Sequence, residues 1–269
     1  MQRVIAFIGG GNMASAVIGG LVAGGHDAAA IIVVEPDGAQ RARLAGERGV
    51  VAVASADATL ARADLVVWAV KPQAFREAAA PCRDHVGAAL QLSVMAGIRC
   101  EAIAAATGTG RVVRAMPNTP ALIGRGIAGL YARDAATADD RAWVEKVLAP
   151  TGRTLWVGQE SDLDAVTALS GSGPAYVFYI VEAMIEAALE MGLTRTQGRQ
   201  LALATLGGAA ELAWRSEDPP EVLRERVTSK GGTTYAALGV LEGAGVKAAF
   251  VDAIRAAQRR ARELGDEFG

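Results

Sequence analysis

Cysteine, histidine and lysine are all scarce in this chain of 269 residues, which contains two, two and four of them. Cys82 and Cys100 form no C-x-x-C motif and no Cys/His cluster, so we predict structural thiols in a reducing compartment. His26 and His85 have no partner at metal-ligand spacing. This argues against metal catalysis and against a histidine general base, and we expect no bound metal.

Charge of one sign and long apolar runs are lacking as well. The formal net charge of -2 leaves no basic surface, so nucleic acid is not an expected partner. Glu, Arg or Gly interrupts every apolar stretch before it reaches membrane-spanning length. The apolar start of the chain runs directly into glycines, as a buried strand does and a signal peptide does not. We therefore expect a cytoplasmic protein that makes no membrane contact.

The first half of the chain alternates short β-branched runs with helical segments rich in alanine. Strands are expected at Val4–Ile8, Ile31–Val34, Leu65–Val70, Leu90–Val94, Arg111–Ala115, Ile127–Tyr131 and Thr154–Val157, and helices at Met13–Ala23, Ala39–Glu47, Gln73–Cys82, Cys100–Ala106 and Ala138–Leu148. Strands separated by helices predict βαβ crossovers and a mostly parallel sheet that is covered on both faces.

No strand pattern is visible after about Glu160. Helices are expected at Leu163–Leu169, Ala175–Met191, Thr196–Trp214 and Val246–Leu264, with a further one that begins at Pro219-Pro220. The change of period predicts two domains, 1–158 and 159–269. Two of these helices, 175–191 and 196–214, carry few charges, so they are either buried within the domain or packed against another subunit. The domain has few residues to cover them, which favours a homo-oligomer.

The first strand is followed by Gly9-Gly10-Gly11-Asn12-Met13-Ala14. This fits the G-x-G-x-x-A form of the dinucleotide fingerprint, in which Gly9 allows the tight turn and Gly11 lets the backbone approach a pyrophosphate at the helix N-terminus. The alternative is a flexible glycine turn with no ligand, but the strand–turn–helix context favours the cofactor. The expected fold class is α/β, a Rossmann-like sheet domain followed by an all-α domain for substrate binding and dimerisation.

Glu35 ends the second strand, where an acidic residue typically bonds the adenosine ribose 2′-hydroxyl. Such a contact favours NADH, but Arg41 and Arg43 follow closely and are able to hold the 2′-phosphate of NADPH. The sequence predicts a nicotinamide coenzyme and leaves the choice between NADH and NADPH open.

Further cofactor contacts are expected at the carboxyl ends of other strands, because these ends line the ligand crevice of a parallel sheet. One such turn is Ala69-Val70-Lys71 and another is Ala96-Gly97. In Arg114-Ala115-Met116-Pro117-Asn118-Thr119-Pro120 two prolines stiffen the turn and direct Asn118 toward the nicotinamide side. The alternatives are an exposed strand end for Lys71 and a structural proline turn for Asn118.

Two polar, glycine-rich segments of the second half each precede a predicted helix. They are Ser170-Gly171-Ser172-Gly173-Pro174-Ala175-Tyr176 and Thr228-Ser229-Lys230-Gly231-Gly232-Thr233-Thr234. Hydroxyls and free N–H groups at a helix N-terminus suit a small carboxylate, although either segment alone is equally explained as a helix cap.

Five motifs together resemble the pyrroline-5-carboxylate reductase family, in the right order and over essentially the whole chain. They are residues 7–13, 69–72, 114–120, 170–176 and 229–234, and the last two are diagnostic. The resemblance implies hydride transfer from NAD(P)H to the C=N carbon of 1-pyrroline-5-carboxylate, which yields L-proline. It implies that Ser229, Gly232 and Thr233 bind the substrate carboxylate, that the Thr234 hydroxyl bonds the ring nitrogen, and that Ser172 and Asn118 lie at the substrate.

Members of this family commonly form dimers through the helical domain, and often decamers built from dimers. Glu35-Pro36-Asp37 departs from the Asn-Arg or Ser/Thr-rich stretch that many members carry after the second strand. Two rivals of the same class are a β-hydroxyacid dehydrogenase, disfavoured because 175–191 contains no lysine, and a reductase of another cyclic imine. A rival of a different class is a non-catalytic dinucleotide sensor.

Overall fold

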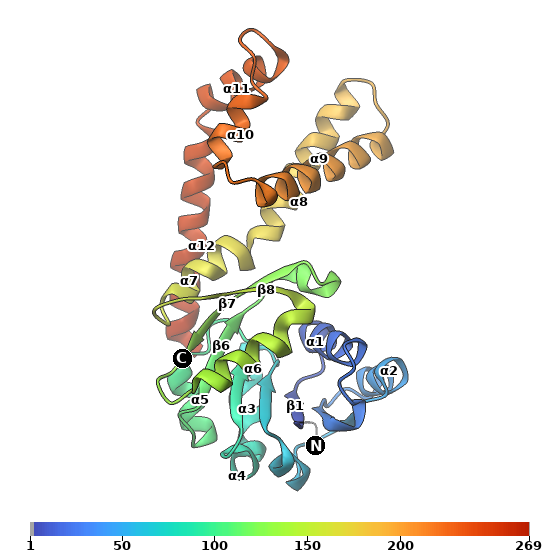
Figure 1. Ribbon diagram of the computed structural model, residues 1–269, viewed down its shortest axis with the longest axis vertical. Coiled ribbons are helices and arrows are strands. Elements are labelled where there is room, and N and C mark those ends of the chain that lie inside the picture. The colour runs from blue at the N-terminus through green and yellow to red at the C-terminus, as the bar shows by residue number, and fades with distance from the viewer. Residues whose placement is uncertain (1–2, 269) are drawn as a thin grey trace. The chain divides into compact units, whose positions relative to one another are not determined.

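A computed structural model describes residues 3–268 of the chain (Figure 1). Its centre is an eight-stranded sheet in the order β3-β2-β1-β4-β5-β6-β7-β8, in which only the β6–β7 pair is antiparallel. The strands are β1 (Ile5–Ile8), β2 (Ile31–Val34), β3 (Val51–Val53), β4 (Leu65–Trp68), β5 (Leu90–Ser93), β6 (Val112–Met116), β7 (Gly126–Ala132) and β8 (Gly152–Trp156). The expected mostly parallel α/β sheet is confirmed.

The helices of this part are α1 (Asn12–Ala23), α2 (Gly38–Arg48), α3 (Phe75–Ala79), α4 (Arg83–Val86), α5 (Cys100–Thr107), α6 (Ala138–Leu148) and α7 (Asp162–Val166), together with the short turns η1 (Ala28–Ala30), η2 (Ala58–Arg62), η3 (Pro72–Ala74), η4 (Ala80–Cys82), η5 (Thr119–Ile123), η6 (Ala149–Thr151) and η7 (Thr167–Gly171). The single helix expected at Gln73–Cys82 is wrong. Pro81 interrupts the helical hydrogen bonds there, so the segment forms several short turns.

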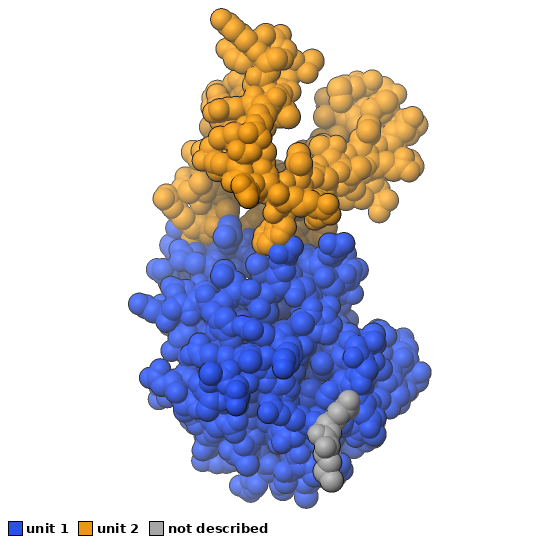
Figure 2. Space-filling model, in the orientation of Figure 1, with its two compact units in different colours: residues 1–172, 257–269 blue, residues 173–256 orange. Residues whose placement is uncertain are grey.

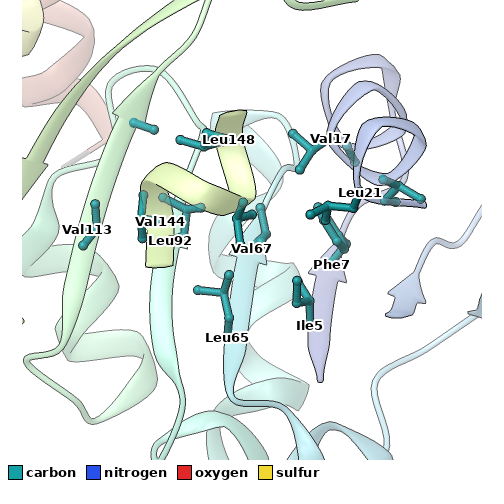
Figure 3. Close-up of a cluster of buried hydrophobic side chains, with 14 of the residues drawn as sticks. Ile5, Phe7, Val17, Leu21, Leu65, Val67, Leu92, Val113, Val144 and Leu148 are labelled. Atoms are coloured by element: carbon teal, nitrogen blue, oxygen red, sulfur yellow. The ribbon is translucent and has the colours of Figure 1, made fainter. Parts of the chain in front are cut away.

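Alternation along the inner strands explains how the sheet holds two cores. In β1, Ile5 and Phe7 point to one face, where α1, α2 and α6 cover them, and Ala6 and Ile8 point to the other. Figure 3 shows the first of these cores, with Phe7 and Val67 facing α1 and α6. The strand β3 was not predicted, because it has only three residues and its side chains are half-buried or exposed at the sheet edge.

The chain divides into two compact units, Met1–Ser172 with Ala257–Gly269 and Gly173–Ala256 (Figure 2). Unit 2 contains α8 (Gly173–Glu190), α9 (Arg195–Arg215), α10 (Pro220–Arg226), α11 (Thr233–Gly243) and most of α12 (Val246–Phe268). The domain boundary expected at 158/159 lies where the strands end, whereas the compact units divide 14 residues later and the last turns of α12 belong to unit 1. The local pattern of apolar residues does not reveal that the last turns of α12 belong to unit 1.

Unit 2 has a small core of its own. Val181 and Ile185 of α8 pack against Ala202 of α9, and no residue of α11 is buried. Most of the large apolar side chains that are exposed in the described chain lie in this unit, among them Tyr179 and Val240. Within residues 3–268, no helix combines the length and the apolar character that a membrane crossing requires.

Candidate functional site

The glycine turn after β1 is shaped by close approach of three strand ends. Gly9 has a φ of +96° and donates its N–H to the Val34 carbonyl of β2 at 2.8 Å. A Cβ at Gly9 would lie 2.7 Å from the carbonyl oxygen of Ala69, the residue that follows β4. The strand order reverses between β1 and β4, and ligands of such sheets bind in the crevice at that point. Gly9, Ala69 and Val70 are therefore neighbours in the structure, as the sequence predicted.

The surroundings of Gly11 differ from those of Gly9. It is the exposed N-cap of α1 with a φ of -64°, and a Cβ there would meet no atom of the described chain within 4 Å. The first N–H groups of α1, which begins at Asn12 and Met13, have no acceptor in the helix itself. Ala14 behind them is buried against the sheet. An open surface in front of a twelve-residue helix N-terminus fits a dinucleotide pyrophosphate.

The end of β2 carries the acidic residue that was expected to face the ribose. One oxygen of the Glu35 carboxylate accepts the Gly10 N–H at 2.8 Å, and the other accepts the Asp37 N–H at 2.9 Å. Arg41 donates to the carbonyls of Glu35 and Pro36 at 2.8 and 2.7 Å. The carboxylate is thus fixed beside the glycine turn, a pairing across 25 residues that local sequence signals do not reveal.

The remaining predicted strand-end contacts differ in their surroundings. Lys71 is exposed at the start of η3 and forms no ion pair with any residue between 3 and 268. Gly97 has a φ of +77°, and its Cβ would lie 3.2 Å from the carbonyl oxygen of Leu264 in α12. Packing against α12 is therefore a sufficient reason for glycine at position 97, beside the predicted coenzyme contact of Ala96 and Gly97.

Asn118 is engaged within unit 1 through both ends of its amide. Its Oδ1 accepts the Ile127 N–H at 3.0 Å, and its Nδ2 donates to the Ser170 carbonyl at 3.2 Å. An α-helix would use the N–H of residue 174 for that carbonyl, but Pro174 has none. Asn118 thus donates to the Ser170 carbonyl in place of the N–H that Pro174 lacks. The same bond holds the proline turn against η7.

The segment Ser170–Tyr176 contains the start of a long helix, as predicted, since α8 begins at Gly173. Before α8 it includes the end of the π-turn η7 and the bend at Ser172, whose N–H bonds the Thr167 carbonyl at 2.8 Å. A Cβ at Gly171 would lie 2.7 Å from Cε of Met116, so a larger residue there would displace the end of that side chain. Pro174 is the second residue of α8, where proline is tolerated because the first N–H groups of a helix have no acceptor within it.

A charged cluster that sequence reasoning missed lies behind this turn. Arg114 in β6, only 4% exposed, pairs with Glu160 at 2.6 Å, and Glu160 also accepts the Cys100 N–H at 2.7 Å. Arg99 and Asp164 form a bidentate pair at 3.1 Å. The one available signal was an arginine in the apolar run of β6. Burial, with Glu160 nearby, raises the pKa of the Cys100 thiol to about 12, which suits a structural cysteine.

The second glycine-rich segment, in unit 2, is the N-terminal turn of α11. Gly232 is its N-cap, and a Cβ there would lie 2.6 Å from Oγ of Ser229. The Gly232 N–H bonds the Ser229 carbonyl at 3.0 Å, and Gly231 has a φ of +74°. The segment folds back so that the Ser229 hydroxyl lies beside the helix start formed by Thr233 and Thr234. Hydroxyls next to the first N–H groups of a helix make a receptor for a small carboxylate.

Residues 160–264 match the family described as pyrroline-5-carboxylate reductase dimerisation, and residues 4–97 match NADP oxidoreductase, coenzyme F420-dependent. The chain is 44% identical to pyrroline-5-carboxylate reductase of Pseudomonas aeruginosa, over 98% of each chain. It resembles the structure of a pyrroline-5-carboxylate reductase from Coxiella burnetii with a TM-score of 0.91 at 36% identity, over 98% of this chain and 99% of that one. For Plasmodium falciparum pyrroline carboxylate reductase with NADP bound, the TM-score is 0.86 at 26% identity, over 98% of each chain.

Proposed function

The chain belongs to the pyrroline-5-carboxylate reductase family, and we propose how its own residues carry out the reaction of that family. It is an NAD(P)H-dependent oxidoreductase that reduces the C=N bond of 1-pyrroline-5-carboxylate to L-proline, the last step of proline biosynthesis. The observation that carries the division of roles is the presence of two open helix N-termini. One begins α1 after a glycine turn, and the other begins α11 beside serine and threonine hydroxyls.

The coenzyme is held by the first of these. Gly9 forms the tight turn, and Gly11, Asn12 and Met13 bind the pyrophosphate, because Gly11 leaves the approach to the α1 N–H groups open. The ends of β4 and β5 provide the adjoining surface, with Ala69, Val70, Lys71, Ala96 and Gly97. When bound, the reduced nicotinamide supplies the hydride that the imine carbon accepts.

The substrate carboxylate is held at the second N-terminus. Ser229 contributes its hydroxyl and Thr233 its backbone N–H at the positive end of α11, while Gly232, whose own N–H bonds the Ser229 carbonyl, shapes the turn that lets the carboxylate approach. Within unit 1, Asn118 acts by positioning, since both ends of its amide are engaged, and it supports the π-turn next to Ser172. A clamp of this kind orients the imine carbon, which is the main requirement of the reaction.

Replacing Ser229 by alanine should raise KM for 1-pyrroline-5-carboxylate about tenfold or more while leaving coenzyme affinity unchanged, because one charge-assisted hydrogen bond to the carboxylate is lost. Steady-state kinetics and a coenzyme titration measure the two quantities. Thr228→Val is the matched control. The Thr228 hydroxyl donates to the Arg224 carbonyl of α10, so its loss should leave KM for the substrate nearly unchanged. Equal effects of both variants would refute the carboxylate role.

Thr234 bonds the ring nitrogen without acting as a strong acid, since a threonine hydroxyl gives up its proton only to a strong base. The nitrogen proton comes from the substrate or from solvent. Thr234→Ala should therefore lower kcat/KM by less than about a hundredfold, below the usual range for loss of a general acid. A loss of many orders of magnitude, measured over a pH series, would assign Thr234 the acid role.

The decisive test of the activity is oxidation of NADH and of NADPH, each with 1-pyrroline-5-carboxylate and the purified full chain. Consumption of reduced coenzyme with formation of proline is the expected result. A folded protein that binds the coenzyme but oxidises it with no cyclic imine would support the dinucleotide-sensor alternative instead. Turnover with another ring and none with 1-pyrroline-5-carboxylate would move the assignment to that imine.

The chain forms a homo-oligomer, as the dimerisation family matched by residues 160–264 indicates. We propose further that the dimer forms through unit 2, that dimers assemble into a decamer, and that the protein works in the cytoplasm. Support for the first comes from the apolar side chains exposed on α8 and α11. Sedimentation velocity of the purified chain distinguishes a dimer from a decamer.

A further inference from the structure

We propose that Glu35 makes this enzyme selective for NADH over NADPH; the inference rests on the coenzyme site proposed above. Glu35 directly follows β2, whose last carbonyl, that of Val34, accepts the Gly9 N–H. The glycine turn and the end of β2 are therefore neighbours. In a site of this topology the adenosine ribose lies at the end of the second strand, next to the pyrophosphate turn. The group at the ribose 2′ position separates the two coenzymes.

The carboxylate of Glu35 is held in place by backbone on two sides. Its two oxygens accept the N–H groups of Gly10 and Asp37, at 2.8 and 2.9 Å. The side chain also lies against Gly10, since a Cβ at that residue would be 3.4 Å from both Cβ and Cγ of Glu35. Rotating the carboxylate away from an incoming phosphate would leave the partly buried Gly10 N–H without its acceptor, which is costly.

Each carboxylate oxygen has room for a second hydrogen bond after the one it accepts from the backbone. A ribose 2′-hydroxyl is able to donate that bond. A 2′-phosphate carries its own negative charge near neutral pH and offers mainly acceptors, so it meets the Glu35 carboxylate with repulsion. The geometry therefore favours the hydroxyl of NADH.

Two nearby arginines are alternative binding groups for a 2′-phosphate, but their contacts in the structure oppose that role. Arg41 donates through Nη1 to the carbonyls of Glu35 and Pro36, so it braces the backbone of the turn. Arg43 is exposed, and its Nη2 lies 3.5 Å from Oγ of Ser15 in α1. Neither forms a salt bridge with the Glu35 carboxylate, which has no ion-pair partner within residues 3–268.

Gln40 adds rigidity to the same corner. Its side-chain amide donates to the Gly10 carbonyl and lies 3.4 Å from Oγ of Ser15. Gly10 is thus bound through its N–H by Glu35 and through its carbonyl by Gln40. With both its polar groups fixed, the turn resists moving as a whole to enlarge the space for a 2′-phosphate.

The test is a calorimetric titration of the full-chain protein with NADH and with NADPH, in the absence of the imine. The wild type should bind NADH at least about tenfold more tightly. Glu35→Gln removes the charge with little change of shape and should shrink the ratio of the two dissociation constants by about tenfold. A wild type that binds NADPH as well or better, or a ratio unchanged in Glu35→Gln, would overturn the proposal.

Two further variants separate Glu35 from its surroundings. Asp37→Asn is the matched control, since it removes a neighbouring negative charge while asparagine keeps the cap that Asp37 provides to Ala39 at 2.9 Å. The ratio of the NADH and NADPH dissociation constants in this variant should stay within about twofold of the wild-type ratio, because the Asp37 charge lies farther along the turn than that of Glu35. Arg41→Gln should weaken both coenzymes alike. A selective loss of NADPH in that variant would instead assign Arg41 to a bound 2′-phosphate.

A gain of NADPH binding does not depend on activity, so this test and that of the reaction can fail separately. Selective NADH binding without imine turnover would refute the reaction and keep the role of Glu35. Imine turnover without selective NADH binding would support the reaction and refute the role of Glu35. Because Glu35→Gln leaves one backbone N–H without an acceptor, the wild type is also titrated with 5′-AMP and adenosine 2′,5′-bisphosphate. Tighter binding of the bisphosphate would contradict the proposal without any variant.

Discussion

Gly9 and Gly11 stand two positions apart, and different constraints require a glycine at each. At Gly9 the φ of +96° and the 2.7 Å approach to the Ala69 carbonyl both exclude a side chain. Gly11 has an ordinary φ and empty space beside it. The fold therefore requires the first glycine, and the proposed coenzyme site accounts for the second.

Alanine substitutions separate these two requirements. Gly9→Ala should lower the free energy of unfolding by about 2 kcal/mol or more, because the new methyl group meets backbone that cannot move aside. Gly11→Ala should change it by less than about 1 kcal/mol, the scale of an altered N-cap, yet weaken coenzyme binding at least tenfold. Urea unfolding and a coenzyme titration give the two readouts. Intact coenzyme affinity in Gly11→Ala would place the pyrophosphate elsewhere.

At the scale of one element, the N-terminus of α6 is joined to β6 by a buried carboxylate. Asp140, whose side chain is 5% exposed, forms a capping box with Thr137 and pairs with Arg111 at 2.7 Å. Burial alone would raise the pKa of Asp140, but hydrogen bonds from Arg111 and Thr137 outweigh it and hold the pKa below the usual 3.8. The folded state thus favours the ionised form of this residue.

That lowered pKa predicts how the helix start responds to acid. The stabilisation by Asp140 should be complete above pH 3.8 and lost as the pH falls from there through the lower folded-state pKa. Asp140→Asn should cost about 1–2 kcal/mol near neutral pH, limited because Arg111 is partly solvent-screened. Urea unfolding at neutral pH and at about pH 3 should show that difference shrinking. A gap that stays constant or widens in acid would contradict the assigned sign.

At the scale of the whole molecule, a single chain leaves apolar side chains of α11 uncovered. No residue of α11 is buried, and Val240 in its middle is 71% exposed. An apolar helix without a covered face is unstable in water, because its packing provides most of its stability. This supports the proposal that neighbouring chains of the homo-oligomer cover unit 2.

Val240→Glu should therefore dissociate the oligomer or shift its mass toward the monomer, since a buried unpaired carboxylate is strongly unfavourable at an interface. Light scattering after size-exclusion chromatography measures the mass. Val51→Glu is the matched control, because Val51 is 54% exposed at the sheet edge of unit 1. An unchanged mass in Val240→Glu would place α11 outside the interface.

The sequence alone determined the long helices, every strand except β3, the glycine turn and the family. Each depends on information within a few neighbouring residues: an apolar period, a glycine after a strand, or a short motif. The run Ile31–Val34 is a strand for local reasons, and it is one in the structure.

Only the tertiary structure decided which partners the polar side chains take. Glu35 meets Gly10 across 25 residues, Asn118 meets Ser170 across 52, and Arg114 meets Glu160 across 46. Such contacts form because the fold brings distant segments together and buried polar groups must then find partners. For the same reason, the π-turn at Gly171 and the return of α12 to unit 1 follow from packing, and no local pattern along the chain announces them.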